Sequence, residues 1–438
     1  MSPRHQVTGS ASAGLLSDGT RLISGNLAPA AEDLLTAAQR ILERDGYAAL
    51  TYRRIAEEAG RNQALISYYF GDRAGLVTLL VHWLNRDRLL EMEQAIDAAP
   101  SNPEAVIDAL LDAQIDMAHD VVGSALWLEL AAHVAGDTRI RPRVALVYAS
   151  YRQLASHAYP EMGPLTDLLI ALVDGMALQY ALGGLEFGGD GAYAVLRRLS
   201  LEWVREHVGA SLHQDPPPST AGSSVSSQKH PDTARERMHE DAPDNPADAL
   251  SPSARKVLQS AYRVLKTGGP ESLTMGSAAE GSGQSTTNVS YHFGSKTELR
   301  NELARLAEFE QWSTWKGWVR QSTTADDGTG RSLVDEPRLL RNLGHMRAFH
   351  NLLPLALRDP NLLEEYRGTF ASIRALIAGP QIGSGNGSGC RSEEMAVLTV
   401  ALAYGLAVQL LLDRRGGFAT RSFDTWSWML QRFLSSGE

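Results

Sequence analysis

The sequence predicts an all-α protein built from two copies of one helical domain. Residues 30–76 align without a gap on residues 253–299, and 16 of these 47 positions are identical. A repeat of this length is too long for a solenoid and indicates a duplicated domain. In both copies apolar residues recur at helical spacing and helix-capping residues precede them, whereas strand signals are nearly absent. A chain of 438 residues has room for two such domains with real cores.

The similarity between the copies extends beyond the aligned block. Asp137 aligns with Asp359 at an offset of 222, and Gly175 and Gln179 align with Gly405 and Gln409 at an offset of 230. The larger offset fits a Gly- and Ser-rich stretch at 379–389 that only the second copy contains. We therefore expect that two whole domains were fused. The expected segments are an arm, a first module, a first helical domain, a linker, a second module and a second helical domain, at 1–26, 27–76, 77–212, 213–250, 251–299 and 300–438.

The arm and the linker are expected to be disordered. Residues 1–26 contain no apolar run of signal-peptide length. Residues 213–250 are rich in Pro, Ser and acidic residues and show no apolar periodicity. A flexible chain of that length reaches roughly 35 Å, so it can join two domains without fixing their arrangement.

Each module is predicted to contain one longer helix followed by two short ones. The first helix ends near Gly46, with an inner face made of Leu34, Leu35, Ala38, Ile41 and Leu42. Thr51 is a suitable N-cap for a helix over 52–59, Gly60 permits a tight turn, and Asn62 is a suitable N-cap for a helix over 63–69. Two short helices joined by such a turn form a helix-turn-helix, whose second helix enters the major groove of DNA.

Further capping signals mark other helix starts. Ser251-Pro252 and Asn102-Pro103 each place a capping residue before a proline at the first helical position. Ser295 and Glu298 form the pattern of a capping box.

The two modules carry a specific signature. It comprises Thr51, Ile55-Ala56, Ala59-Gly60 and the run from Ile66 to Arg73 in the first copy, and Thr274, Ala278-Ala279, Gly283 and the run from Val289 to Lys296 in the second. This signature resembles that of the TetR family of bacterial transcriptional regulators. The resemblance implies three DNA-binding helices followed by about six helices that hold an effector pocket, with dimerisation through the last two helices.

The resemblance also assigns DNA contacts position by position. The start of the third helix would contact bases through Gln63 and Ala64 in the first copy and Thr286 and Thr287 in the second. Phosphates would be held by Tyr68, Tyr69 and Arg73, and by Tyr291, His292 and Lys296. The remaining expected DNA-binding positions, near the backbone path or on the same helices, are Thr51, Tyr52, Arg53, Asn62, Ser67, Thr274, Ser285 and Ser290.

The second module departs from the first in its short helices. Met275-Gly276-Ser277 replaces Tyr52-Arg53-Arg54, and Gly281 and Gly283 are expected to loosen its second helix by roughly 1 kcal/mol per Gly relative to Ala. Ser67 and Ser290 stand where the family often has Tyr. The second module could therefore bind DNA weakly.

The long helical region after each module is expected to contain an effector pocket of at least roughly 300 Å³, different in the two halves. The candidate lining residues in the first half are Trp127, His133, Tyr148 and Tyr151, and in the second His345, Phe349 and Tyr366. Ordinary helix packing is the alternative for each of them.

The two halves are expected to pack on each other within one chain. The contact would join Leu165–Leu182 and Ala192–Val208 to Met395–Leu412 and Asp424–Leu434, because these helices are too apolar to face water. Tethering favours this internal pairing over a second chain, although a homodimer is also conceivable. The resulting pseudo-dimer has two unlike recognition helices, so its double-stranded operator DNA should be asymmetric.

Composition limits other functions. The net charge of −10 gives no general attraction to nucleic acid, so DNA binding would depend on local surfaces. Met395–Leu412 lacks charges over 18 residues, which is the lower limit for a membrane span, but a central bundle helix is preferred. The single Cys390 fits a reducing cytosol, so a cytoplasmic location is expected. No metal or other cofactor is expected, and the effector remains an unknown small molecule.

The function expected from these observations is a DNA-binding transcriptional regulator, namely a repressor that a small ligand releases. One alternative is a regulator with a single active module and a degenerate second half used for dimerisation or ligand sensing. The other is a helical enzyme, which is disfavoured because the sequence contains no Ser/His/Asp set, metal-ligand cluster or phosphate-binding loop.

Overall fold

The structure, a computed structural model, describes residues 27–98, 102–182, 189–208, 245–268, 270–324, 333–378, 388–413 and 417–435. Within these ranges every regular element is a helix, so the prediction of an all-α fold is confirmed. The expected arm at 1–26 and residues 213–244 of the expected linker lie outside the described residues. We call residues 27–208 the first half and residues 245–435 the second half.

The two halves have the same order of helices. The first half consists of α3 (Pro29–Asp45), η1 (Tyr47–Ala49), α4 (Tyr52–Ala59), α5 (Ala64–Phe70), α6 (Arg73–Ala98), α7 (Pro103–His119), α8 (Val121–Val134), α9 (Arg141–Ala158), η2 (Pro160–Met162), α10 (Gly163–Ala181) and α11 (Gly189–His207). The second half consists of α13 (Pro252–Thr267), η4 (Pro270–Ser272), α14 (Met275–Ser282), α15 (Thr286–Phe293), α16 (Lys296–Thr324), α17 (Glu336–Ala356), α18 (Pro360–Ala378), α19 (Ser388–Leu412) and α20 (Gly417–Ser435).

Most predicted helix boundaries in the modules match the structure. The Thr51 side chain accepts from the backbone N–H of Arg54 at the start of α4, and Gly60 ends this helix in the left-handed conformation at φ 61°. Ser251 caps α13 in the same way. The capping box is formed, because Glu298 accepts from the Ser295 N–H and Ser295 accepts from the Glu298 N–H.

Two details differ from the prediction. Helix α5 begins at Ala64 rather than at Gln63, because the Asn62 side chain forms a local turn and accepts from the Ala64 N–H at 2.8 Å. Gly283 does not lie within α14 and so does not loosen it. It is the C-cap, with φ 70°, and plays the part that Gly60 plays in the first module.

The end of the expected linker is held against the second module. Ala247 is buried, and its carbonyl accepts from Arg255 Nε on α13 at 2.8 Å. The packed part of the second half therefore begins several residues before the predicted boundary at residue 251.

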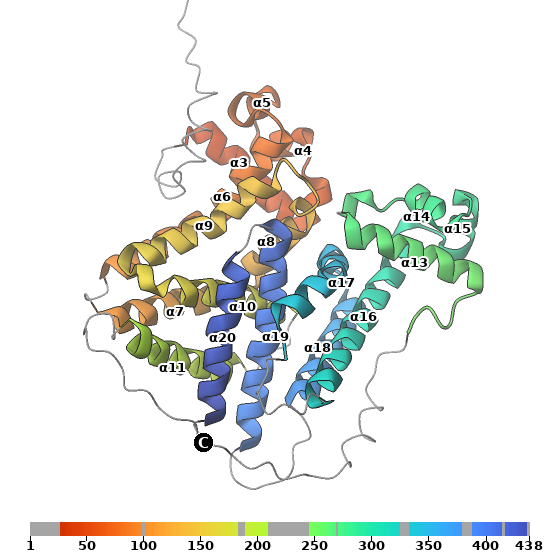
Figure 1. The fold of residues 1–438 in the computed structure, drawn as a ribbon. Coiled ribbons are helices and arrows are strands. Elements are labelled where there is room, and N and C mark those ends of the chain that lie inside the picture. Colours follow the sequence, from red (N-terminus) through yellow and green to blue (C-terminus); the bar gives the residue numbers. More distant parts are fainter. Residues whose placement is uncertain are drawn as a thin grey trace, which may run out of the picture.

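The halves pack on each other along α10 and α19, which lie in the middle of the molecule in Figure 1. Helix α10 also contacts α20, and α11 contacts both α19 and α20. Residues Glu393–Leu412 would be long and apolar enough to cross a membrane, but they are entirely buried among the other helices. Their uniformly apolar character follows from this central position, since neighbours cover them on all sides.

The contact between α10 and α19 is reciprocal. A Cβ atom on Gly175 would lie 1.8 Å from the carbonyl oxygen of Ala401, and one on Gly405 would lie 1.7 Å from that of Ala171. Gly175 aligns with Gly405, and Ala171 with Ala401, at the same offset of 230. Such an exchange of equivalent contacts is the property of a twofold axis. The two helices therefore cross at backbone distance about a pseudo-twofold axis.

Hydrogen bonds across the contact follow the same symmetry. Arg152 on α9 donates from Nη2 to Gln409 Oε1 at 2.9 Å, and Arg374 on α18 donates from Nη1 to Gln179 Oε1 at 3.3 Å. Arg152 aligns with Arg374 at an offset of 222, and Gln179 with Gln409 at 230. The packing of the halves thus resembles that of two subunits in a symmetric dimer.

Candidate nucleic-acid interface

The first module is a compact three-helix unit. The apolar face of α3 predicted from the sequence is buried, as are Ile55 on α4 and Ile66 and Phe70 on α5. These side chains hold α5 against α3, so its opposite face is free. Gln63, Ala64, Ser67 and Tyr68 are all exposed on that face. The Tyr68 ring is 55% exposed, which is unusual for a large aromatic side chain and leaves it available to a partner.

The second module has the same arrangement. Val289 and Phe293 are the buried residues of α15, while the predicted contact residues Thr286, Thr287 and Ser290 are exposed. Tyr291 is 82% exposed. The remaining predicted positions are also at the surface: Thr51, Arg53, Asn62, Arg73, Thr274, Ser285 and Lys296 are exposed, and Tyr52, Tyr69 and His292 are half-buried.

The recognition helix of the second module is attached through a polar cluster that the sequence analysis did not identify. Ser253 at the start of α13 bonds to His292 Nε2 at 3.0 Å and to Asn288 Nδ2 at 3.2 Å. Gln284 contacts the same serine. In the first module the position of Asn288 is Leu65 and that of His292 is Tyr69. The two recognition helices are thus held by different chemistry, and His292 is engaged in this cluster.

The two expected phosphate ligands beyond the recognition helices have different surroundings. Arg73 lies over the ring of Tyr47, with 5.1 Å from its guanidinium carbon to the ring centre. Lys296 is exposed at the start of α16. Burial and the nearby Arg300 lower the pKa of Lys296 from its usual value. Its charge would be favoured by any phosphate placed near it.

A cleft of about 490 Å³ lies between the first module and the second half. Its lining comes from the first module, from the end of α8 and the following loop, and from η4 of the second half: Tyr47, Arg73, Ala74, His133, Gly136, Asp137, Thr138, Arg139, Ile140, Glu271 and Ser272. The candidate pocket residue His133 belongs to this cleft, where its ring lies 4.3 Å from that of Tyr47. Burial lowers the pKa of His133.

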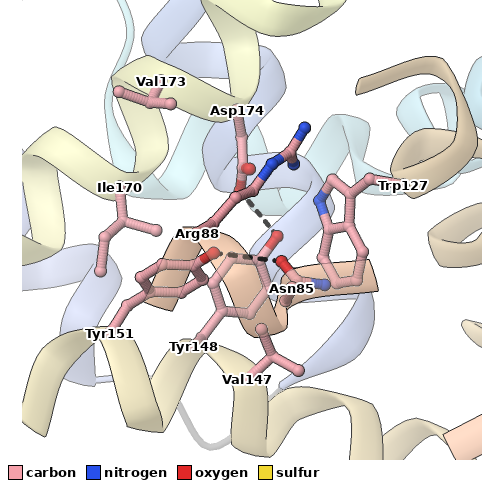
Figure 2. A pocket seen from close by; sticks show the side chains of 9 residues that line it. All are labelled: Asn85, Arg88, Trp127, Val147, Tyr148, Tyr151, Ile170, Val173 and Asp174. Carbon is pink, nitrogen blue, oxygen red and sulfur yellow. Dashed lines mark hydrogen bonds between the residues drawn. The ribbon is translucent and has the colours of Figure 1, made fainter. Parts of the chain in front are cut away.

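A small cavity inside the body of the first half contains three of the other candidate pocket residues. Trp127, Tyr148 and Tyr151 surround it, and Figure 2 shows them around Asp174 and Asn85. The Tyr148 hydroxyl donates to Asp174 Oδ2 at 2.6 Å, and the Tyr151 hydroxyl donates to Asn85 Oδ1 at 3.1 Å. Burial raises the pKa of Asp174 to about 7.

The volume of this cavity is about 30 Å³, far below the expected 300 Å³. It is the size of about one water molecule. The sequence analysis missed Asn85, Arg88 and Asp174 as lining residues, although an acid within an apolar helix was an available signal for Asp174.

The corresponding region of the second half is filled by aromatic side chains. Asp174 aligns with Tyr404, and Trp127 and Tyr148 align with Phe349 and Phe370. Phe349 lies with its ring centre 5.3 Å from that of Tyr404 and 5.2 Å from that of the candidate residue Tyr366. All of these rings are fully buried. The larger side chain of Tyr404 therefore occupies the space that remains open beside Asp174.

The last candidate pocket residue, His345, lies instead where α17 meets α13. It bonds to the Tyr262 hydroxyl at 3.2 Å and to Lys266 Nζ at 2.7 Å. Burial, together with Lys266, lowers the pKa of His345 to about 4. Its ring is therefore neutral at pH 7 and accepts the proton of Lys266, which ties the second module to its helical domain.

Comparisons with known proteins bear directly on the first module. Residues 34–80 match the model of the bacterial regulatory proteins of the tetR family. Residues 34–80 are a TetR-family domain. The prediction of this family is therefore confirmed for the TetR domain of the first half, which contains α4, α5 and the start of α6.

Relatives of the TetR domain extend the similarity beyond the module. The HTH-type transcriptional regulator BetI of Paraburkholderia phytofirmans is 25% identical over 173 residues, which are 37% of this chain and 87% of that protein. BetI of Brucella canis is 28% identical over 162 residues, 34% of this chain and 79% of that protein. A solved structure from Pseudomonas aeruginosa PAO1 is 22% identical, covers 43% of this chain and 95% of its own, and gives a TM-score of 0.35, too low to support an argument. A whole BetI relative thus has about the size of one half of this chain.

Proposed function

We propose that this protein is a sequence-specific DNA-binding transcriptional regulator in which the two halves of one chain act as an internal pseudo-dimer on an asymmetric operator. The observation that carries the proposal is the reciprocal packing of α10 and α19 between two bodies that each bear a recognition helix with an exposed outer face. The BetI relatives, named as transcriptional regulators, support the same function for the first half.

The exposed residues of the two recognition helices support an asymmetric operator. Gln63 can bond an adenine through two hydrogen bonds, whereas the methyl groups of Thr286 and Thr287 can contact thymine. A symmetric dimer binds a palindrome because its site repeats its symmetry. Two recognition helices with different side chains instead require two half-sites of different sequence.

Ligand control, if it operates through the body, is proposed for the first half. The first half retains a polar cavity around Asp174, whereas Tyr404 fills the equivalent place in the second. At about 30 Å³ the cavity must open before it can admit a small organic molecule, which supports release of DNA through a change in the packing of α6, α8, α9 and α10. Repression, rather than activation, follows the usual behaviour of the family and is part of the proposal.

The test is sedimentation of the complex with DNA. The operator is first located by footprinting the region upstream of the gene. We expect one chain of 47.5 kDa on a short duplex that contains both half-sites. A complex of two chains on a short palindromic duplex would overturn the internal pseudo-dimer, and no binding to any duplex at low salt would overturn the DNA-binding function.

A second candidate is a regulator whose second module no longer binds DNA. It is favoured by the polar cluster that engages His292 and by Gly276 and Gly281 at and within α14. Footprinting separates the candidates, because this regulator would protect a single half-site whereas the pseudo-dimer protects two.

A further inference from the structure

The contact between the halves is nearly symmetric in shape but not in charge. In the part of the chain that the structure describes, the ion pairs between the halves are Glu129–Arg358, Asp167–Arg421 and Glu202–Arg432. In each of them the first half supplies the carboxylate and the second half supplies the arginine. The first half is therefore the acidic partner and the second half the basic partner of the contact.

The Asp167 pair is the most buried of the three. Its side chain is 2% exposed and lies between Arg152 of its own half, 2.5 Å away at Nε, and Arg421 of the other half, 2.6 Å away at Nη2. At the offset of 230, Asp167 aligns with Val397 and Arg421 aligns with Gly191. The pseudo-twofold axis therefore produces no second copy of this pair.

Glu202 and Arg432 occupy the same position of the repeat, because they too are separated by 230 residues. Arg432 Nε lies 3.0 Å from Glu202 Oε2, so the position faces its own equivalent across the axis. Two first halves would place Glu opposite Glu, and two second halves would place Arg opposite Arg. Like charges opposite each other are destabilising.

The third pair also lacks a mirrored copy. Arg358 contacts Glu129, which in turn accepts from the backbone N–H of Tyr47 at 2.8 Å. The equivalents at the offset of 222 are Gly136 and Asn351, and neither carries a charge. Pairing of like halves would leave Glu129 or Arg358 without its partner.

We propose that these three pairs make the contact selective for the unlike half, so that neither half can pair stably with a second copy of itself. The proposal rests on the internal pseudo-dimer proposed above. The apolar contact cannot provide this selectivity, because Gly175 and Ala171 have identical counterparts in Gly405 and Ala401 and would permit like halves to pack. Charge complementarity contributes specificity to such contacts more than affinity.

The test is a charge-swap cycle at Glu202 and Arg432 in the full chain. Both residues lie near the ends of α11 and α20 and are partly exposed, so the variants should fold. In R432E and in E202R like charges face each other, which opens the contact and exposes its apolar face. We expect the association constant for two-chain species, measured by sedimentation velocity, to rise about tenfold in each, the equivalent of about 1.4 kcal/mol. The double variant E202R/R432E should return to the wild-type value.

R432E is the more direct single variant, since Arg198 also contacts Glu202 within the first half. The matched control is E104R, which breaks the exposed pair of Glu104 with Arg205 inside the first half and should leave association unchanged. If the single variants behave as wild type, or if the double variant is worse than either, the charge code is wrong. If wild type itself binds DNA as two chains while the cycle still shows restoration, the code holds between chains and only the internal pseudo-dimer fails.

Discussion

At the scale of single residues, similar positions in the two halves have acquired different tasks. The pair Asp174 and Tyr404 illustrates this, because one leaves a polar cavity and the other closes it. The pair Tyr69 and His292 is a second case, since one packs beside Tyr68 and the other bonds to Ser253. The divergence between the copies is therefore concentrated where the side chains face a ligand cavity or a module interface.

Substitution of Asp174 should change the pH dependence of stability. Its folded pKa of about 7 is raised above the usual value of 3.8 by burial. The folded state thus holds its proton more tightly, and the carboxyl group loses stability for the protein as the pH rises from about 4 to 7. Asp174→Asn keeps an acceptor for Tyr148 and removes this loss. We expect the variant to gain about 1–3 kcal/mol over wild type at pH 8 but little at pH 4.

Urea unfolding at the two pH values measures this effect. Tyr148→Phe serves as a comparison, since it removes the hydroxyl that donates to Asp174 but keeps the titrating group. An Asp174→Asn variant that gains the same amount at both pH values would show that the carboxyl group does not titrate differently in the folded protein.

Arg73 and Lys296 are predicted to contact phosphates rather than bases. Replacing either by Ala should weaken binding to the same extent for every sequence and reduce the salt slope of log K by about one unit. Binding titrations over a range of salt concentrations, on the operator and on a random duplex, test this. A changed base preference with an unchanged slope would contradict it. Arg73 must also give up or keep its contact with Tyr47, so its slope is the more informative one.

At the scale of elements, most of the modules could be predicted from the sequence because local signals determine them. Thr51 and Gly60 bound α4, and Ser251 begins α13, through caps that involve only neighbouring residues. The start of α5 was misplaced by one residue, because the sequence does not distinguish a cap at Asn62 from a turn. The role of Gly283 was misjudged although its alignment with Gly60 already indicated a C-cap.

Contacts between distant elements could be predicted only in outline. Apolar periodicity indicated which helices would join the halves, but it carries no information about which arginine meets which acid. The pairs of Asp167 with Arg421 and Glu129 with Arg358 depend on the crossing of helices more than 200 residues apart. The candidate pocket was predicted as one site, yet His133 and His345 lie at module junctions, because helical spacing alone does not tell which inner face a residue shares.

The crossing of α10 and α19 provides a prediction at this scale. Gly175→Ala or Gly405→Ala places a Cβ atom less than 2 Å from a backbone oxygen of the other half, so the helices must separate. We expect a loss of about 1–3 kcal/mol in unfolding free energy, despite the higher helix propensity of Ala. Gly317→Ala on α16 is the control, since its Cβ would meet nothing within 4 Å, and it should gain roughly 0.5–1 kcal/mol. Equal gains in all three variants would exclude a close crossing.

At the scale of the whole molecule, the two modules are unlike parts attached to one paired body. In Figure 1 they lie apart, with α19 and α20 below and between them. Each module can therefore be altered without a change in the other. This separates the contributions of the two half-sites in a way that a dimer of identical chains does not allow.

Removing the contact residues of one module should affect one side of the footprint. In Gln63→Ala/Tyr68→Ala the first recognition helix loses a base contact and a phosphate contact, while Thr287 and Tyr291 are retained. We expect loss of protection on one flank only, and the corresponding substitutions of Thr286 and Tyr291 should remove the other flank. Loss of both flanks from either variant would instead indicate that each chain contributes the same module to both half-sites.

The reciprocal crossing of Gly175 and Gly405 within one chain also bears on how the protein responds to its own abundance. A regulator made of separate subunits loses its partner on dilution, so its occupancy of DNA rises with the square of its concentration at low copy number. Here the partner cannot diffuse away. Occupancy would rise in simple proportion to the number of chains, down to a few molecules per cell. Defective chains made alongside intact ones would also be unable to mix with them, so one damaged gene copy would not interfere with another.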